Sequence, residues 1–305
     1  MKHSVVQVTG GLGNQLFQLS FAKNLYLRES SPVGLDLSYY SNQSMRFFEF
    51  YLRDYIDLFH EVRGFALTRY LPNRLVPFVK VKSLPVMVIR SKNYEKYLLI
   101  RSDESYKQFS MELANTTNRY FSGTFASPLY WNHSTFHENI EWVRSSLLKW
   151  KPVDDSNLNV GIAIHARRGD LVSNPKTRAF HGFCGTSYFT DAIDLLAKDG
   201  WHRRGIRISS DDTSFAQVLA NHARKYTDRV ELLLPEISSQ ESLKKLSESE
   251  TFIGSNSTFS WWAAYLQKKH VRVFPKQWFL SKKAEFDPAL LFPDKPLLID
   301  RGLEF

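Results

Sequence analysis

Two adjacent arginines in the second half of the chain are the side chains best suited to hold a phosphate. Arg167 and Arg168 stand in segment 165–170, which reads His-Ala-Arg-Arg-Gly-Asp and directly follows an apolar run that predicts a strand. A guanidinium stays charged, so either side chain would need a buried partner in a protein core. Beside a ligand, the pair would offer planar sets of donors to phosphate oxygens. The alternative is a solvated corner in which both arginines pair with Asp170.

A second segment suited to bind a diphosphate is 254–262, which reads Gly-Ser-Asn-Ser-Thr-Phe-Ser-Trp-Trp. It follows a predicted strand and opens a predicted helix. Ser257 or Thr258 can cap that helix, and its free backbone N–H groups and positive dipole end would then favour a pyrophosphate. The alternative is an ordinary helix cap. In either case we expect Trp261 and Trp262 to pack in the core.

A third segment offers carboxylates at the end of another predicted strand. Ser209 and Ser210 are followed there by Asp211 and Asp212. Either aspartate can accept hydrogen bonds from the N1–H and the amino group of guanine. A cap for the helix that follows is an equally sensible use of Asp212.

A glycine-rich segment near the start, 10–15, reads Gly-Gly-Leu-Gly-Asn-Gln. Gly11 and Gly13 match two positions of the dinucleotide fingerprint, and Asp36 ends the next predicted strand about where a ribose-binding acid would stand. Leu16 occupies the place of the third glycine, so the helix and the strand could not approach as that fingerprint requires. The match to an NAD site is weak, and the alternative is that the glycines only turn the chain.

The elements that must position these segments alternate between strands and helices. Apolar residues recur with period two in the predicted strands and with a helical spacing in the predicted helices. The segment 38–120 predicts no definite element. The predicted strands are 4–9, 32–36, 120–125, 159–165, 207–209, 230–234, 251–254 and 271–274, and the predicted helices are 14–29, 136–150, 188–199, 214–225, 241–249 and 257–268.

This alternation with short connections indicates the α/β class, with parallel strands joined by right-handed crossovers into doubly wound sheets. Pro152 and the pair Asp154–Asp155 mark a linker over 151–157. We therefore expect an N-terminal domain at 1–152, a C-terminal domain at 158–280 and a C-terminal tail at 281–305.

Together these segments resemble glycosyltransferase family 11, the α-1,2-fucosyltransferases of bacterial type. The family has a Tyr-Phe-x-x-Ala-Ile stretch and a Pro-Lys-x-Trp-Phe stretch, which stand here at 188–193 and 275–279, so the resemblance covers nearly the whole chain. Leu171 stands where the family usually has tyrosine, so a contact by that hydroxyl is not expected. The main motifs are Gly-Gly-Leu-Gly-Asn-Gln, His-x-Arg-Arg-Gly-Asp, Ser-Asp-Asp and Asn-Ser-Thr-Phe-Ser-Trp-Trp, here at 10–15, 165–170, 210–212 and 256–262.

The resemblance implies a GT-B fold, in which two Rossmann-like doubly wound domains face a central cleft. The N-terminal domain would lie on the acceptor side, and the C-terminal domain would bind the donor. The implied reaction is inverting transfer of L-fucose from GDP-β-L-fucose to the 2-hydroxyl of a galactose residue in an oligosaccharide, such as an O-antigen or lipopolysaccharide. No metal or other cofactor is implied, and the sequence contains no Asp-x-Asp pair to hold a metal on the diphosphate.

The resemblance also implies roles for individual residues. Arg167 would hold the β-phosphate of the donor, with Arg168 beside it. For the base that takes the acceptor proton, Asp170 and His181 are rival candidates, and Asp170 would alternatively brace the arginines. The residues implied in donor binding are His165 with Asp211 or Asp212 at guanine; Ser257, Thr258 and Phe259, with Asn256, at the diphosphate and nucleoside; and Gly11, Gly13 and Asn14 from the first domain.

Composition limits the class of protein. Apolar residues make up 43 % of the chain and charged residues 23 %, which excludes disorder throughout. Cys184 is the only cysteine, so an internal disulfide and a multi-cysteine zinc site are excluded. No apolar run is long enough to span a bilayer and the start does not read as a leader, so we expect a cytoplasmic protein. The net charge of +9 suits peripheral contact with anionic lipid at the inner face of a bacterial membrane.

Two other functions fit parts of the sequence. An NAD-dependent dehydrogenase would use Gly11, Gly13 and Asp36, but it leaves the arginine pair and the Ser257 segment without a role. A non-catalytic basic protein that binds glycans or RNA would use the scattered basic and aromatic residues of the middle region. Neither a zinc-finger spacing nor an RNA-recognition motif supports it, so we expect no nucleic-acid partner.

Overall fold

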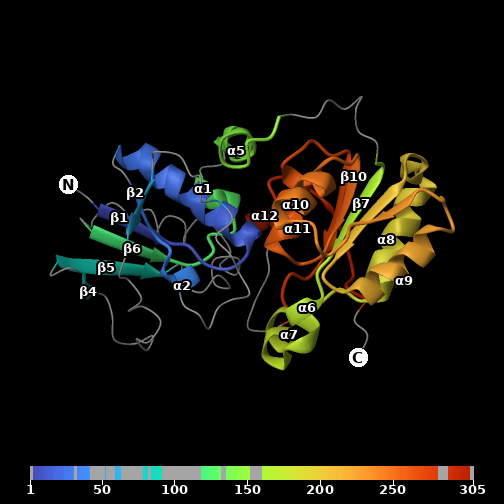
Figure 1. The fold of residues 1–305 in the computed structure, drawn as a ribbon, viewed down its shortest axis with the longest axis horizontal. Coiled ribbons are helices and arrows are strands. Elements are labelled where there is room, and N and C mark those ends of the chain that lie inside the picture. Colours follow the sequence, from blue (N-terminus) through green and yellow to red (C-terminus); the bar gives the residue numbers. More distant parts are fainter. Residues whose placement is uncertain are drawn as a thin grey trace. The chain divides into compact units, whose positions relative to one another are not determined.

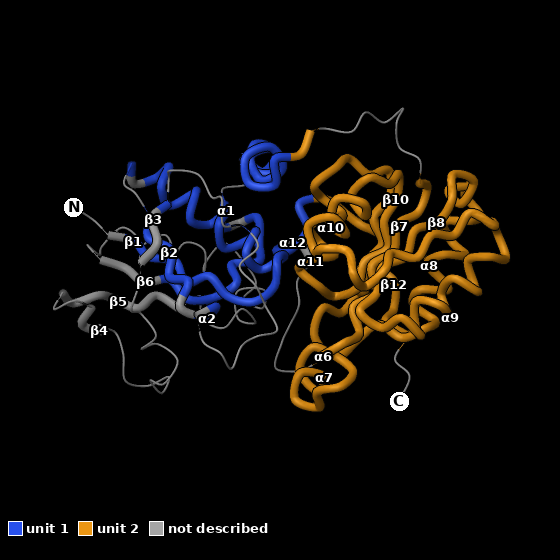
Figure 2. Tube along the Cα trace, viewed as in Figure 1, with its two compact units in different colours: residues 1–149, 289–293 blue, residues 150–288, 294–305 orange. Residues whose placement is uncertain are grey.

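The computed structural model describes residues 3–30, 33–41, 52, 59–62, 78–81, 84–90, 118–131, 135–151, 160–280 and 288–302. The chain forms two compact units, one of Met1–Lys149 with Ala289–Pro293 and the other of Trp150–Pro288 with Asp294–Phe305 (Figure 2). Most of segment 38–120 and of the predicted linker 151–157 lies outside the described residues. Among those residues, no helix is both long enough and apolar enough to cross a bilayer.

The first unit is built on a mixed sheet with the strand order β3-β2-β1-β6-β5-β4 (Figure 1). Neighbouring strands pair in parallel except β4 and β5, which run antiparallel. The described elements of this unit are β1 (His3–Gln7), α1 (Leu12–Glu29), β2 (Val33–Asp36), α2 (Ser38–Ser41), β3 (Phe59–Val62), β4 (Phe78–Val81), β5 (Leu84–Arg90), β6 (Asn118–Ser122), a 3-10 turn (Pro128–Trp131), α5 (Phe136–Trp142) and a π turn (Val143–Leu147), together with most of α12 (Pro288–Leu291).

The helix α1 is held to its unit by an apolar stripe that the sequence predicts. Leu16, Phe17, Phe21 and Leu25 are all at most 2 % exposed. The Phe21 ring stacks on the Phe125 ring with 4.0 Å between their centroids, and ring pairs of this kind add to the free energy gained from burial alone. The predicted helix is confirmed, and it begins at Leu12, two residues earlier than expected.

The second unit is built on a parallel sheet with the strand order β12-β11-β10-β7-β8-β9. Its described elements are β7 (Ile162–Ala166), α6 (Gly169–Ser173), α7 (Pro175–His181), α8 (Thr186–Lys198), a 3-10 turn (Trp201–Arg204), β8 (Ile206–Ser210), α9 (Thr213–Ala223), β9 (Val230–Leu232), α10 (Ser239–Ser247), β10 (Thr251–Gly254), α11 (Thr258–Tyr265), β11 (Val271–Pro275) and β12 (Leu297–Ile299).

Helices cover both faces of this sheet, as a doubly wound fold requires. Figure 1 shows α8 and α9 on one face and α10 and α11 on the other. Ile162 and Ile164 of β7 face the helices α8 and α9, in a core with Ile206, Ile208 and the buried faces of both helices. Because side chains alternate along a strand, the residues between them face α10 and α11, and β7 is buried on both sides. The predicted α/β class is confirmed, with a parallel sheet in this unit and a sheet in the first unit that is parallel except for β4 and β5.

The second unit differs from the expectation in two short helices that were not predicted, α6 and α7, and in its C-terminal tail. The helix α7 was not predicted, although Asn174 caps it by accepting hydrogen bonds from the backbone of Lys176 and Thr177, and Pro175 opens it. Both residues are helix-start signals in the sequence. The expected tail 281–305 is not separate over its described part, because β12 joins the second sheet beside β11 and α12 lies mostly in the first unit.

The predicted helix 136–150 also ends differently. The α5 helix stops at Trp142 and continues as a π turn over Val143–Leu147, which closes with a hydrogen bond from Leu148 N to Val143 O at 2.9 Å. The register of the apolar residues shifts by one position across such a turn, so a single helical spacing does not describe both parts.

Candidate functional site

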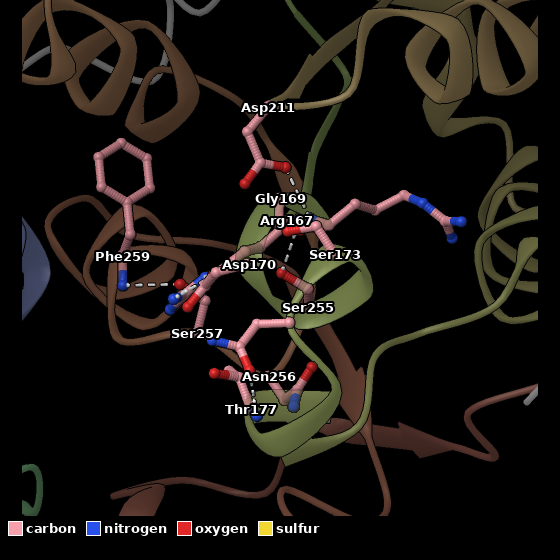
Figure 3. A network of polar contacts seen from close by, with 12 residues as sticks. Arg167, Gly169, Asp170, Ser173, Thr177, Asp211, Ser255, Asn256, Ser257 and Phe259 are labelled. Carbon is pink, nitrogen blue, oxygen red and sulfur yellow. Dashed lines mark hydrogen bonds and ion pairs between the residues drawn. The ribbon is translucent and has the colours of Figure 1, made fainter. Parts of the chain in front are cut away.

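The strand order of the second unit places a ligand site at one edge of its sheet. From β7 the chain moves to β8 and β9 on one side, and then returns to β10, β11 and β12 on the other. The connections after β7 and β10 therefore leave in opposite directions. Ligands of open α/β sheets bind at such a switch point, outside the carboxyl ends of the strands. The segments 166–170, 210–212 and 254–258 all follow carboxyl ends at this edge (Figure 3).

Arg167 is tied to the neighbouring loop through its backbone and leaves its side chain partly exposed. Its N–H donates to Ser255 Oγ at 3.1 Å. Its Nε and Nη2 donate to Asp170 Oδ1 at 3.3 and 2.8 Å, and the side chain is 32 % exposed. Within the described part of the chain, Asp170 is the partner of this guanidinium, and both groups reach solvent. The structure thus presents one arginine–aspartate pair at the switch point.

The Arg168 side chain takes different partners. Its guanidinium carbon lies 4.0 Å from the centre of the Phe215 ring and 5.0 Å from that of Phe183, and its Nε lies 3.4 Å from Asp212 Oδ2. Only 14 % of this side chain is exposed. The arrangement is a cation–π contact with a carboxylate alongside. In the structure each of the two guanidiniums has its own partners, and a contact of Arg168 with a donor phosphate remains a prediction.

The two aspartates after β8 bind parts of the protein itself. Asp212 caps α9 by accepting from Phe215 N at 2.9 Å, which was one of its two expected uses. Asp211 Oδ1 accepts from Arg168 N at 2.6 Å, and a Cβ at Gly169 would stand 2.5 Å from Asp211 Oδ2. A glycine at 169 therefore allows the carboxylate to approach the loop. A contact of either aspartate with guanine remains a prediction.

A chain of hydroxyl groups joins the β7 loop to the start of α11. His165 Nδ1 lies 2.6 Å from Ser260 Oγ, Ser260 Oγ lies 3.1 Å from Ser255 Oγ, and Ser255 Oγ accepts from Arg167 N. Ser255 and Ser260 are both fully buried. Sequence reasoning did not single out either serine, although both lie in the segment 254–262. Their role became visible only when the two loops were brought together.

His165 is held in its neutral form within this chain. Burial lowers the pKa of His165 to about 3, with a further contribution from the charge of Arg167. Its ring also packs against Phe259, with 4.7 Å between the ring centroids. A neutral imidazole beside Arg167 can exchange hydrogen bonds without adding a second positive charge.

The start of α11 is built by side chains that bond within the protein. Ser257 caps the helix by accepting from Phe259 N at 3.2 Å, and Ser257 and Thr258 are 3 % and 8 % exposed. Asn256 is 4 % exposed, and its Nδ2 donates to the carbonyls of His181 and Trp278 at 3.1 and 3.0 Å. Asn256 thus binds the turn after α7 through its side chain, so a direct contact with a donor is left to its backbone.

His181 stands at the end of α7 beside the Arg167–Asp170 pair. The pKa of His181 is lowered to about 4, mainly by burial and also by the charges of Arg167 and Arg301, while Asp170 acts in the opposite direction. Its imidazole is therefore neutral near pH 7. The structure brings both candidate bases, Asp170 and His181, to the same edge of the sheet.

The glycine-rich segment of the first unit forms the turn between β1 and α1. Gly10 has φ +77°, and a Cβ there would stand 2.5 Å from Asn14 Nδ2. Gly11 is the N-cap residue of α1, and its carbonyl accepts from Asn14 N at 3.0 Å. Gly13 lies in the first turn of that helix. Asp36, the expected ribose-binding acid of an NAD site, is fully buried. A buried carboxylate is poorly placed to meet a ribose.

Comparison with known proteins shows which families and proteins the sequence of this chain is similar to. A model of the family described as glycosyl transferase family 11 matches residues 4–289. The Escherichia coli alpha-1,2-colitosyltransferase is 27 % identical, covering 97 % of this chain and 99 % of that protein. The O-antigen biosynthesis glycosyltransferase WbnK of Escherichia coli is 28 % identical, covering 89 % of this chain and 93 % of that protein.

Among solved structures, a mutant of Arabidopsis thaliana FUT1 in complex with GDP is similar with a TM-score of 0.50. The sequences are 12 % identical, and the match covers 94 % of this chain and 72 % of that one. At this level of identity the likeness shows the fold alone. It agrees with the predicted GT-B class.

Proposed function

Because this chain belongs to glycosyl transferase family 11, we propose that it transfers L-fucose from GDP-β-L-fucose to the 2-hydroxyl of a galactose residue in an O-antigen or a similar glycan. The observation that supports this most is the Arg167–Asp170 pair at the switch point, where the carboxyl ends of β7 and β10 meet. The relatives that act in colitose transfer and O-antigen biosynthesis support a deoxysugar donor and a surface glycan acceptor.

The proposed chemistry begins with the departure of GDP. As the bond from fucose to the β-phosphate breaks, the sugar gains positive charge and the diphosphate gains negative charge. Arg167 is partly exposed and paired with Asp170, a surface ion pair that costs little to rearrange, so its donors can turn to the phosphate oxygens. The N-terminus of α11 adds backbone N–H donors and the positive end of the helix dipole. The helix donors are in place before the charge develops, and those of Arg167 need only exchange Asp170 for the phosphate.

A base completes an inverting transfer by taking the proton of the acceptor hydroxyl. Asp170 and His181 are both proposed for this step. The bonds from Arg167 to Asp170 favour a bracing role for Asp170, while the lowered pKa of His181 makes its neutral imidazole a weak base, so both stay candidates for the proton acceptor. In this scheme side chains and the helix dipole supply all the positive charge at the diphosphate, and no metal takes part.

The test is a transfer assay on the purified chain. GDP-β-L-fucose is incubated with a panel of galactose-terminated oligosaccharides, and the linkage of any product is determined by NMR. We expect an α-1,2-linked fucose on galactose and equal rates with and without EDTA. Loss of activity in EDTA that manganese restores would contradict the metal-free scheme. No transfer to any galactoside would contradict the proposed acceptor.

A second donor is favoured by the colitosyltransferase relative, which is similar over nearly the whole chain. The same panel is therefore run with GDP-activated colitose, and the ratio of kcat/KM for the two donors decides between them. A thermal-shift measurement distinguishes the proposed glycosyltransferase from the alternative function, an NAD-dependent dehydrogenase. GDP should raise Tm through binding to the folded state, while NAD should leave Tm unchanged.

A further inference from the structure

The C-terminal segment 294–302 returns to the second unit and buries an arginine there. The strand β12 pairs with β11, and Lys276 N donates to Ile299 O at 2.8 Å. Arg301 follows two residues later and is 3 % exposed. Its carbonyl accepts from Gly185 N at 2.8 Å, which fixes the backbone of this residue against the start of α8.

The Arg301 guanidinium is a buried cation with few partners. Its Nη2 donates to His181 O at 2.6 Å. Among the described residues, its other polar neighbour is the Cys184 side chain, which lies within hydrogen-bond reach, and no carboxylate forms an ion pair with it. Burial lowers the pKa of Arg301, and the neighbouring Cys184 thiol and Tyr188 hydroxyl act in the opposite direction. A buried charge without a counter-charge is costly, so we expect an anion to balance it when the site is filled.

The turn after α7 is shaped around this guanidinium. Gly182 has φ +61°, and a Cβ there would stand 2.9 Å from Arg301 Nη1 and 3.0 Å from Leu280 Cβ. The carbonyl of His181 accepts from both Arg301 Nη2 and Asn256 Nδ2. Glycine is thus the residue that both the backbone angle and the close approach of the arginine require.

Arg301 and Arg167 act on the same group from different segments. Both lower the pKa of His181, after burial, and Asp170 opposes them. The imidazole therefore lies within electrostatic reach of two guanidiniums and one carboxylate. The charges of Arg167 and Arg301 both contribute to the positive potential at this turn. Solvent screens the charge of Arg167, which is partly exposed, more than that of the buried Arg301.

We propose that Arg301 is a positioning residue of the donor site, which anchors the His181–Gly182 turn and supplies a buried positive charge that favours the diphosphate held by Arg167. The inference rests on the proposed function, because it takes a nucleoside diphosphate as the ligand. It adds to that function a contribution from a segment more than 120 residues away from the arginine motif.

The test compares the binding of GDP and guanosine by isothermal titration calorimetry. The two ligands share the base and ribose and differ in the diphosphate, so the ratio of their Kd values reports the charge. Arg301→Gln removes the charge and keeps a donor for His181 O. We expect it to weaken GDP binding by about tenfold or more while guanosine changes less than about twofold. Arg301→Lys keeps the charge and should hold the ratio within about threefold of the unaltered chain.

Arg272 gives the matched control. It tethers the same C-terminal segment through Asp294 at 2.7 Å and donates to Ala264 O at 2.9 Å, but it has a carboxylate partner. Arg272→Gln should leave the GDP-to-guanosine ratio unchanged. The proposal is overturned if Arg301→Gln binds GDP normally, or if it weakens both ligands equally, as a purely structural role would.

If Arg301→Gln does not fold, Arg301→Lys decides the matter. A retained ratio then supports the role of the charge, and a lost ratio overturns it. Failure of the unaltered chain to bind GDP is a separate result, because it overturns the proposed function and this inference together. Failure of the inference alone leaves GDP bound by the unaltered chain.

Discussion

Arg167 and Asp170 form the smallest unit on which the proposed chemistry depends. The guanidinium donates twice to one carboxylate oxygen, and both side chains reach solvent. An exposed pair of this kind contributes roughly 0–1 kcal/mol to stability, so the protein loses little if it is broken. The same guanidinium at a departing diphosphate contributes far more to catalysis, because its donors act where charge develops.

Replacing Arg167 by alanine should therefore remove turnover and leave the fold intact. We expect kcat to fall by two decades or more, corresponding to about 3–4 kcal/mol of transition-state stabilisation. The measurement is initial-rate kinetics with the GDP-sugar, beside circular dichroism to verify folding. Arg224→Ala is the control, since Arg224 is exposed and its side chain bonds only to Asn221 in the described part of the chain. Near-normal turnover in a folded Arg167→Ala variant would contradict the assignment.

The two partly buried histidines of the site predict a pH dependence of stability. Folding lowers the pKa of His165 to about 3 and that of His181 to about 4, mainly by burial, from an ordinary value near 6.5. The unfolded chain therefore binds more protons below pH 6.5, and the folded state loses stability as pH falls through that value. Each histidine contributes a slope of about 1.4 kcal/mol per pH unit between pH 6.5 and its folded pKa.

His181→Gln tests this slope. Urea unfolding is measured from pH 7.5 to pH 5, and the free energy of unfolding of the variant should decline less steeply than that of the unaltered chain. The accumulated difference at pH 5 should be about 2 kcal/mol. His137→Gln on the exposed side of α5 serves as the control and should keep the full slope. Identical slopes for all three proteins would mean that His181 is protonated in the folded state.

At the scale of elements, the site depends on how the β7 loop is held between β8 and α11. Asp211 fixes it from one side through Arg168 N, and Ser255 fixes it from the other through Arg167 N. Each bond joins loops that are 43 or more positions apart in the chain. The loop conformation is therefore a property of the assembled sheet rather than of its own residues.

Gly169→Ala probes the Asp211 side of this arrangement. The new Cβ would stand 2.5 Å from Asp211 Oδ2, so the carboxylate must move away from Arg168 N. A lost hydrogen bond to a charged group costs about 1.5–3 kcal/mol of stability, so we expect Tm to fall by several degrees and kcat/KM for the donor to fall at least about tenfold. The measurement is donor kinetics together with thermal unfolding.

A double-mutant cycle shows whether the effect passes through that contact. If it does, Gly169→Ala adds little to an Asp211→Ala variant, because the bond is already absent. Additive losses would show that the new methyl group disturbs the loop in another way. An unchanged kcat/KM in the single variant would show that the hydrogen bond from Arg168 N to Asp211 does not contribute to use of the donor.

At the scale of the whole molecule, the net charge of +9 predicts that the protein binds anionic membranes and not neutral ones. Lys and Arg near an anionic surface are each attracted by up to about 1 kcal/mol, and salt screens the attraction. We expect the protein to sediment with phosphatidylglycerol vesicles at low salt, to be released by salt, and to leave neutral vesicles unbound. Equal partition onto anionic and neutral vesicles would contradict a peripheral association through charge.

The fold class was predictable from the sequence because the signals are local. The strand at 251–254 and the helix beginning near 257 were set by a short apolar run and the Ser257 cap, and the structure has β10 over Thr251–Gly254 and α11 from Thr258. The capped start of α7 at Asn174–Pro175 carried the same kind of signal and went unused. The short strand β12 carried none, since it exists only by pairing with β11.

The sequence by itself determined the alternation of strands and helices and the three loops that carry arginine, serine and aspartate, because periodicity and capping are encoded within a few neighbouring residues. Only the tertiary structure decided that Arg167 and Arg168 have different partners and that Ser255 and Ser260 link the loops to His165. It also decided that Arg301 donates a hydrogen bond to the carbonyl of His181. The physical reason is that strand order brings together residues distant in the chain, and no local signal states that order.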